Sequence, residues 1–252
     1  MKRILLISLL LLAVILTVNA DRRRMLGARN VASAGIVCSG AILSDGTERF
    51  ESGTGAFCLT GWTETDTVGA LDSFNSVKFV TGTKSMRVDL TNAANSFIYA
   101  NPADDAFSVR FYLHVTNWVN GMGAGAVVDI FQTDNETSFA GSPSIGVNLR
   151  RSGTPACAIQ LRTGATDTAG PNLTENTWYR VEVTCNRNAT STMRVYSIGG
   201  AQLGTDVTAT GADAAGTYFC FGKESADTGS ATIFIDNIIY SAAGTFPIGS
   251  DE

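Results

Sequence analysis

The chain has 252 residues, 18 Lys and Arg against 23 Asp and Glu, and a formal net charge of −5 at pH 7. Affinity for nucleic acid or for an anionic membrane comes from neutralising phosphates with Lys and Arg. The acidic balance therefore excludes nucleic acid as an expected partner.

The N-terminus has the pattern of a secretory signal peptide. Lys2 and Arg3 precede the apolar run ILLISLLLLAVILTV, which ends at Val18, and the small residues Val18 and Ala20 suit signal peptidase. An uncleaved membrane anchor is the alternative, but a run of about 15 residues is short of the ~20 that span a bilayer. We predict cleavage of residues 1–20, no membrane span afterwards, and a secreted, extracellular protein.

The rest of the chain is predicted to form one all-β domain over residues 45–243, between a linker or arm at 21–44 and a tail at 244–252. No sustained apolar pattern with helical period occurs. Segments of period two dominate instead, broken by Gly, Asn, Asp, Ser and Thr, as in a sandwich or barrel of short strands. The predicted strands are 47–51, 77–81, 85–91, 96–100, 107–115, 126–132, 144–150, 156–162, 178–185, 192–198, 217–222 and 232–241.

Two of these segments have clearly distinct faces. In FSVRFYLHV (107–115), apolar side chains alternate with Ser108, Arg110, Tyr112 and His114, which is the only histidine of the chain. Residues 178–185 alternate in the same way. A shift of one residue would bury the polar set, so the register is well determined and the polar faces are expected to be solvated.

Short sequence motifs along the chain resemble those of the concanavalin A-like lectin/glucanase superfamily, which includes laminin-G-like domains. The motifs are RFESGTG, GW and GTKSMRV at the start of the domain and WYRVEV, MRVYSIGG and IFIDNIIYS at its end. The resemblance spans roughly residues 47–242 and implies a two-sheet antiparallel jelly-roll sandwich. The galactose-binding-like jelly roll is the competing likeness, and the long meander at 107–198 favours the concanavalin A-like arrangement.

In such sandwiches one sheet curves into a groove that carries the ligand. If the central strands are neighbours in one sheet, alternation brings four arginines to one face. Arginine presents a planar fork suited to carboxylates and sulfates, so an acidic polysaccharide is the expected ligand. The predicted binding residues are Arg110, Tyr112, His114, Asn148, Arg150, Gln160, Arg162 and Arg180, together with Trp118 in a loop, where it would stack on a sugar ring.

The resemblance also offers an enzymatic alternative. The polysaccharide lyases of the superfamily cleave polyuronates by β-elimination, with a cation or amide on the uronate carboxylate and a His or Tyr that removes the C5 proton. Tyr112 and His114 are the candidate catalytic residues, about 7 Å apart along their strand. The clustered carboxylates of the superfamily's glycoside hydrolases do not occur here.

The resemblance further implies a structural Ca²⁺ between the first and last strands, for which Glu51 and Asp236 are the candidate ligands. A hydrogen bond from the backbone or an Arg would satisfy Asp236 equally well. No other cofactor is expected. The five cysteines leave at least one thiol over. Cys38–Cys58 is the favoured pair, while Cys157 and Cys185 either pair with each other or serve as small buried hydrophobic residues.

The sequence therefore predicts a secreted, non-catalytic, lectin-like domain that binds a polysaccharide or glycoconjugate. A polyuronate lyase is the first alternative. An extracellular structural or adhesion protein is the second.

Overall fold

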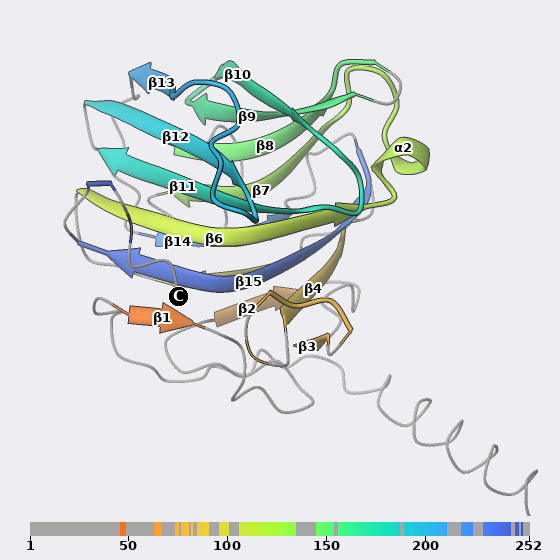
Figure 1. Cartoon of the computed structure of the whole chain (residues 1–252), viewed down its shortest axis with the longest axis horizontal. Helices are drawn as coiled ribbons and strands as arrows, with labels where there is room; N and C mark the ends of the chain where they lie inside the picture. Colours follow the sequence, from red (N-terminus) through yellow and green to blue (C-terminus); the bar gives the residue numbers. More distant parts are fainter. Residues whose placement is uncertain are drawn as a thin grey trace, which may run out of the picture. The chain divides into compact units, whose positions relative to one another are not determined.

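The computed structural model (Figure 1) describes 46–48, 63–66, 74–75, 77–80, 82, 85–90, 96–100, 106–134, 145–153, 156–186, 189–210, 218–223, 229–242, 245–246 and 248. All of them belong to one compact unit, Gly35–Glu252. In these ranges no helix reaches the length and hydropathy that a membrane span requires.

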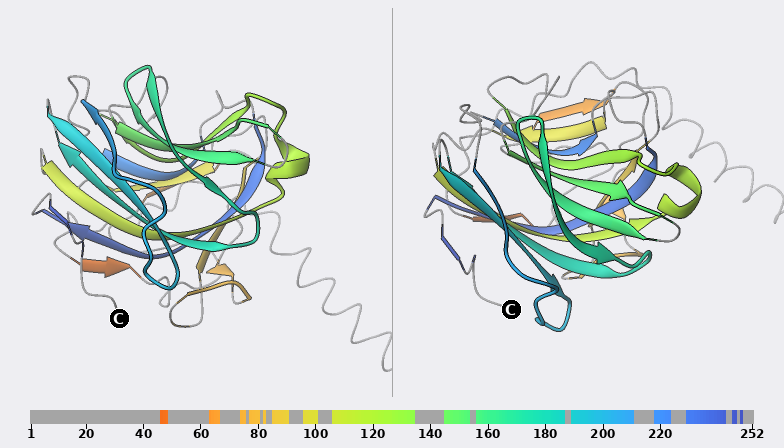
Figure 2. Two further views of the ribbon diagram at one scale, coloured as in Figure 1. Left: turned by 45° about the horizontal axis from the view of Figure 1, so that its top comes forward. Right: turned by 90° about the horizontal axis from the view of Figure 1, so that it is seen from above.

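The described strands form two antiparallel sheets, which Figure 2 shows from two further sides. Sheet A runs β13 (Val207–Thr210), β12 (Thr190–Ser197), β11 (Trp178–Asn186), β6 (Ala106–Thr116), β15 (Ala231–Ser241), β4 (Ser85–Leu90) and β3 (Phe74–Asn75), and β1 (Gly46–Glu48) also pairs with β15. Sheet B runs β10 (Thr166–Leu173), β9 (Cys157–Thr163), β8 (Ile145–Arg151), β7 (Val127–Asp134), β14 (Tyr218–Lys223), β5 (Ser96–Ala100) and β2 (Thr63–Asp66).

The chain changes sheets repeatedly, as in a jelly roll. After β6 it passes through the short helix α2 (Trp118–Gly121) into sheet B, where β7 to β10 form a meander. It returns to sheet A for β11 to β13, crosses again for β14 and ends with β15 in sheet A. The predicted fold class, an all-β jelly-roll sandwich of two antiparallel sheets, is confirmed.

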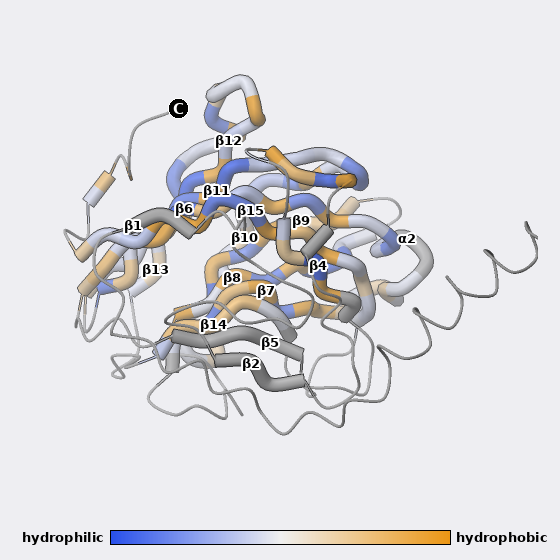
Figure 3. The backbone as a smooth tube through the Cα atoms, turned by 90° about the horizontal axis from the view of Figure 1, so that it is seen from below, coloured by the Kyte–Doolittle hydropathy of each residue, from blue (hydrophilic) through white to orange (hydrophobic). Residues whose placement is uncertain are grey.

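The hydrophobic core lies between the sheets and is built by the alternation that the sequence predicts. Phe111 of β6 meets Phe221 of β14 edge to face, with ring centroids 5.0 Å apart, and Phe131 of β7 lies 5.2 Å from Phe221. Each fully buried side chain of this size contributes about 1.5–3 kcal/mol relative to exposure. Figure 3 shows the resulting change between hydrophobic and hydrophilic residues along the strands of both sheets.

Most predicted strands agree with the structure to within two residues at each end, and four strands were not predicted. These are β2, β3, β10 and β13. β10 contains Gly170 and Pro171 and shifts register between Ala169 and Asn172, so it shows no alternation. The predicted strand at 77–81 is wrong: residues 77–80 form an irregular loop, and β3 lies just before it.

Candidate functional site

The predicted arginine groove does not exist as a single surface. Arg110 on β6 and Arg180 on β11 belong to sheet A, whereas Arg150 on β8 and Arg162 on β9 belong to sheet B. Alternation separates the core face of each strand from its outer face. It does not reveal that the chain crosses between sheets after β6 and again after β10, so each sheet has its own outer face with two of the arginines.

On the outer face of sheet A the charged side chains are buried and engage one another. The Arg180 Nε lies 3.3 Å from the Glu182 Oε1, and the guanidinium group stacks on Tyr196 at 4.1 Å. Glu182 is 1% exposed and Arg110, its register neighbour on β6, is 2% exposed. The prediction that this face is solvated is therefore wrong. The side chains avoid the cost of isolated buried charges by pairing instead.

His114 also lies on this face, in an aromatic setting. Its ring centroid is 5.2 Å from that of Trp178 and 5.5 Å from that of Phe234, and its Nε2 is 3.3 Å from the Lys78 Nζ. Burial, reinforced by the charge of Lys78, lowers the pKa of His114 from 6.5 to about 4. The imidazole is therefore neutral at pH 7 and accepts a hydrogen bond from Lys78 at Nε2.

The described part of the C-terminal segment packs on the other end of the same face. Phe246 lies under the guanidinium group of Arg194 at 4.2 Å, and Ile248 is buried. Ser108 Oγ is 3.5 Å from the Thr245 carbonyl oxygen, to which it donates. Tyr112 is buried as well, at 7% exposure. The outer face of sheet A is thus occupied by contacts within the protein.

Trp118 was predicted to stack on a sugar ring, and this prediction is wrong. It begins α2, is 1% exposed and belongs to the core cluster with Met122 and Val128. The preceding Asn117 has a left-handed backbone with φ 61°. This turn directs the indole ring into the protein rather than into solvent.

The outer face of sheet B carries a charge-balanced centre at Arg162. The Arg162 Nε lies 2.7 Å from the Asp167 Oδ1, and the Arg162 Nη1 lies 3.3 Å from the Asp129 Oδ1. The Asn148 Nδ2 also donates to the Asp167 Oδ1 at 3.1 Å. Burial opposes ionisation of Asp167, but the hydrogen bond and charge of Arg162 outweigh it and hold the pKa of this carboxyl below its usual value.

Three amide side chains of this face have buried oxygens that accept no hydrogen bond from the described residues. They are Gln132 on β7, Asn148 on β8 and Gln160 on β9, and we call them the amide row. Asn148 and Gln160 are direct register partners, and Gln132 pairs with Gly146 two residues along β8. All three residues are at most 5% exposed. A buried acceptor without a donor costs about 1–3 kcal/mol.

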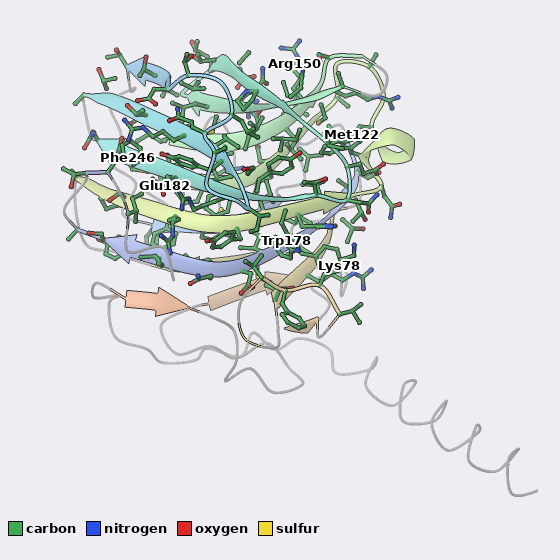
Figure 4. All side chains as sticks on the ribbon, viewed as in Figure 1. Lys78, Met122, Arg150, Trp178, Glu182 and Phe246 are labelled. Atoms are coloured by element: carbon green, nitrogen blue, oxygen red, sulfur yellow. The ribbon has the colours of Figure 1, made fainter. Side chains whose placement is uncertain are left out.

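A hollow of about 330 Å³ adjoins the amide row, and we call it the end pocket. The small residues Gly125, Ala158 and Ala169 leave the space open. The polar lining residues are Arg150, Arg151, Ser152 and Gln160. The Arg150 side chain is exposed and forms no hydrogen bond or ion pair with described residues, although its charge helps to lower the pKa of Asp167. Figure 4 labels Arg150, which belongs to sheet B, well apart from Glu182 and Trp178, which belong to sheet A.

The end pocket is bordered by a rigid turn between α2 and β7. Gly125 N–H donates to the Arg151 carbonyl oxygen at 2.8 Å, and Arg151 N–H donates to the Ala126 carbonyl oxygen at 3.1 Å. The Arg151 side chain donates to the carbonyl oxygens of Met122 and Gly153. Gly125 has φ 81°, a conformation that favours glycine.

The predicted calcium ligands are only partly described. Glu51 lies outside the described residues. Asp236 is fully buried, and its Oδ2 and Oδ1 accept the backbone N–H groups of Val80 and Asn237, each at 2.7 Å. This carboxylate therefore needs no cation to satisfy it, and a calcium site stays a prediction.

Of the cysteines, Cys38 and Cys58 lie outside the described residues, so their pairing is untested. Cys157 and Cys185 are free and buried, so they do not pair with each other and act as small core residues. Burial, opposed only weakly by Arg151, raises the pKa of the Cys157 thiol to about 12.

Sequence reasoning missed Gln132, Asp129 and Asp167 as members of the sheet B face. The register of β7 shifts between Asp129 and Phe131, which breaks the alternation there. Asp167 lies on the unpredicted strand β10. Only the register of the neighbouring strands shows that these side chains share a face with Arg162.

No protein-family model matches the chain, and no curated protein sequence matches it. Solved structures do. A protein of unknown function from Shewanella oneidensis MR-1 is 15% identical, with a TM-score of 0.55 over 84% of this chain and 93% of that one. The cellulose-induced protein Cip1 is 15% identical, with a TM-score of 0.50 over 79% of this chain and 98% of that one. At these identities the likeness shows the all-β sandwich fold alone.

Proposed function

We propose that this protein binds carbohydrate through the outer face of sheet B, at the amide row and the end pocket. The observation that carries the proposal is the set of three buried amide oxygens without donors among the described residues, beside a hollow lined by the exposed Arg150. Sugar hydroxyls are the donors that such acceptors need. A ligand that supplies them recovers the cost of about 1–3 kcal/mol per buried acceptor.

The outer face of sheet A is the poorer candidate because its charged side chains are buried within the protein, whereas the sheet B face has a hollow lined by the exposed Arg150. The cation and the proton acceptors that a lyase needs do lie together on β6, but Arg110, Tyr112 and His114 are each at most 7% exposed, so a substrate does not reach them. His114 Nε2 already faces Lys78 Nζ at 3.3 Å. Carbohydrate binding without this lyase chemistry is therefore the function we favour.

The proposal extends to three features expected from the sequence. We place the fold in the concanavalin A-like group of jelly rolls, we expect secretion through residues 1–20, and we expect the ligand to carry an acidic group for Arg150. A structural or adhesion protein that recognises a copy of itself is the competing outcome.

A polysaccharide panel tests the proposal, with retention on immobilised polymers as the readout. The protein without residues 1–20 is expected to be retained on at least one polymer, and Gln160→Met to weaken retention about tenfold. Gln202→Met is the matched control, because Gln202 is an exposed amide on the sheet A side that donates to Asp206. Equal retention of the two variants would contradict the proposal, as would no retention together with an apparent mass that grows with protein concentration.

A further inference from the structure

We infer that the end pocket binds the last sugar of a glycan chain, and that this sugar carries a carboxylate or sulfate. The inference rests on the proposed carbohydrate binding and adds which part of a glycan is recognised. Its basis is the distribution of charge, space and rigid backbone along the outer face of sheet B.

Charge is the first step. At the end pocket Arg150 brings an exposed guanidinium group that forms no hydrogen bond or ion pair with described residues, while the Arg151 side chain is held by the carbonyl oxygens of Met122 and Gly153. Further along the face, Arg162 lies between Asp129 and Asp167, so its charge is balanced. Arg162 pairs with Gly146, four residues from Arg150 on β8, which is about 13 Å along the strand.

This distribution disfavours a regular polyanion along the whole face. If one acidic group bound Arg150, the next ones would approach Asp129 and Asp167. Like charges within about 4 Å repel by roughly 4 kcal/mol near a protein surface. A chain with one acidic sugar in the end pocket and neutral sugars over the amide row fits the same groups without this repulsion.

Shape is the second step. The hollow lies where the strands end, and it is bordered by the turn between α2 and β7 and by Ser152 of the β8–β9 loop. Backbone hydrogen bonds between Gly125, Ala126 and Arg151 hold that turn in place. A glycan chain that lies on the amide row would therefore be blocked by this turn and would end in the pocket. The volume of about 330 Å³ is at the lower limit of ligand pockets, which span about 300–1,000 Å³, and suits one or two sugar rings.

Chemistry is the third step. The planar fork of arginine binds an oxyanion through two parallel hydrogen bonds. Gln160 is also a lining residue, and its amide oxygen, which has no donor among the described residues, would accept a hydroxyl of the same sugar. A terminal uronic acid or a terminal sulfated sugar presents both groups, whereas a neutral terminal sugar leaves Arg150 without an anion.

Calorimetric titration with defined oligosaccharides tests the inference. The probes are a tetrasaccharide with glucuronate at its non-reducing end, its carboxyl-reduced counterpart, a tetrasaccharide with glucuronate only inside, and one with a terminal 6-sulfated sugar. We expect at least one of the two terminal acidic probes to bind at least tenfold tighter than the reduced and internal probes. The stronger of the two identifies the oxyanion.

Two variant pairs locate the effect. Arg150→Ala should abolish the preference for a terminal acid, whereas Arg194→Ala, on sheet A, should keep it. Ala169→Leu should fill the pocket and weaken binding of the preferred terminal acidic probe about tenfold. Ala165→Leu makes the same change at an exposed alanine in the β9–β10 turn and should leave binding unchanged.

The outcomes separate this inference from the proposed function. Equal affinity for internal and terminal acidic probes, or an Arg150→Ala variant that keeps the preference, would overturn end recognition while carbohydrate binding stands. Failure of every probe and of the polysaccharide panel would overturn both.

Discussion

The outer faces of the two sheets contain similar residues and differ in how these residues are satisfied. On sheet A, Arg180 has Glu182 and Tyr196, His114 has Lys78, and Asp236 has two backbone N–H groups. On sheet B, the amide row has oxygens without donors among the described residues, and the exposed Arg150 side chain forms no hydrogen bond or ion pair with them. Sheet A also has buried atoms without a hydrogen bond to described residues, among them His114 Nδ1 and Glu182 Oε2, so sheet B differs in that its amide row adjoins an open hollow and the exposed Arg150.

The largest expected effect concerns the buried charges of sheet A. Glu182→Ala leaves Arg180 buried without the carboxylate that lies 3.3 Å away, and should lower the free energy of unfolding by about 3–5 kcal/mol. Urea denaturation measures the loss. Arg194→Ala is the control, because its pair with Asp206 is 30% and 38% exposed and such pairs contribute about 1 kcal/mol or less. A loss below 1 kcal/mol for Glu182→Ala would mean that sheet A is not held by this pair.

The next effect is the pH dependence that His114 gives to stability. Its pKa is about 4 in the folded protein and near 6.5 when unfolded, so the unfolded state takes up the proton first as pH falls. Stability is fully present above pH 6.5 and should decline by roughly 3 kcal/mol toward pH 4. His114→Gln should flatten this part of the profile.

Nuclear magnetic resonance can follow the titration without ambiguity in untagged protein, because the chain has one histidine. A midpoint near 6.5 in the folded state would contradict the buried position of His114. Glycan binding should not follow this titration, since His114 lies on the other sheet.

A smaller effect with the opposite sign is expected on sheet B. Gln160→Met removes a buried acceptor without a donor and keeps a similar side-chain volume, so the free protein should be as stable as the parent or more stable by up to about 1 kcal/mol. Thermal denaturation measures this. A loss of stability above 2 kcal/mol would show that the Gln160 oxygen is needed by the fold rather than left for a ligand.

The smallest effect concerns the core thiols, which belong to neither outer face. Cys157 and Cys185 are buried, and burial raises the pKa of both. Iodoacetamide at pH 8 should therefore leave both unmodified in the native protein and modify them in denaturant, as peptide mass spectrometry would detect. Native labelling of either residue would contradict its place in the core.

Period-two alternation was sufficient to predict the fold class, most strands and the polar face of regular strands such as β6, β8, β9 and β11. The FSVRFYLHV segment is the clearest case, since Phe107, Val109, Phe111, Leu113 and Val115 are all in the core. Alternation is a local property, however, and sheet membership depends on where the chain crosses over. The passage through Trp118–Gly121 into sheet B has no counterpart in the pattern of strands, so the four arginines were assigned to one surface.

Burial of polar residues was the second limit. A glutamate on the polar face of a strand is expected to be solvated. Glu182 is nevertheless 1% exposed, because other parts of the protein cover sheet A. The amide row was only partly predicted for a related reason: Gln132 follows a shift in register, and the lack of donors for the three oxygens depends on side-chain positions.

The measurement that tests the central claim most directly is nuclear magnetic resonance of the protein during titration with a retained glycan. The account predicts that the side-chain amide signals of Gln160 and Asn148 and the backbone signals of Arg150 and Ala169 shift first. The signals of β6 and β11, including the His114 ring, should stay in place. Shifts centred on His114, Trp178 and Glu182 would instead assign the ligand to sheet A and contradict the account.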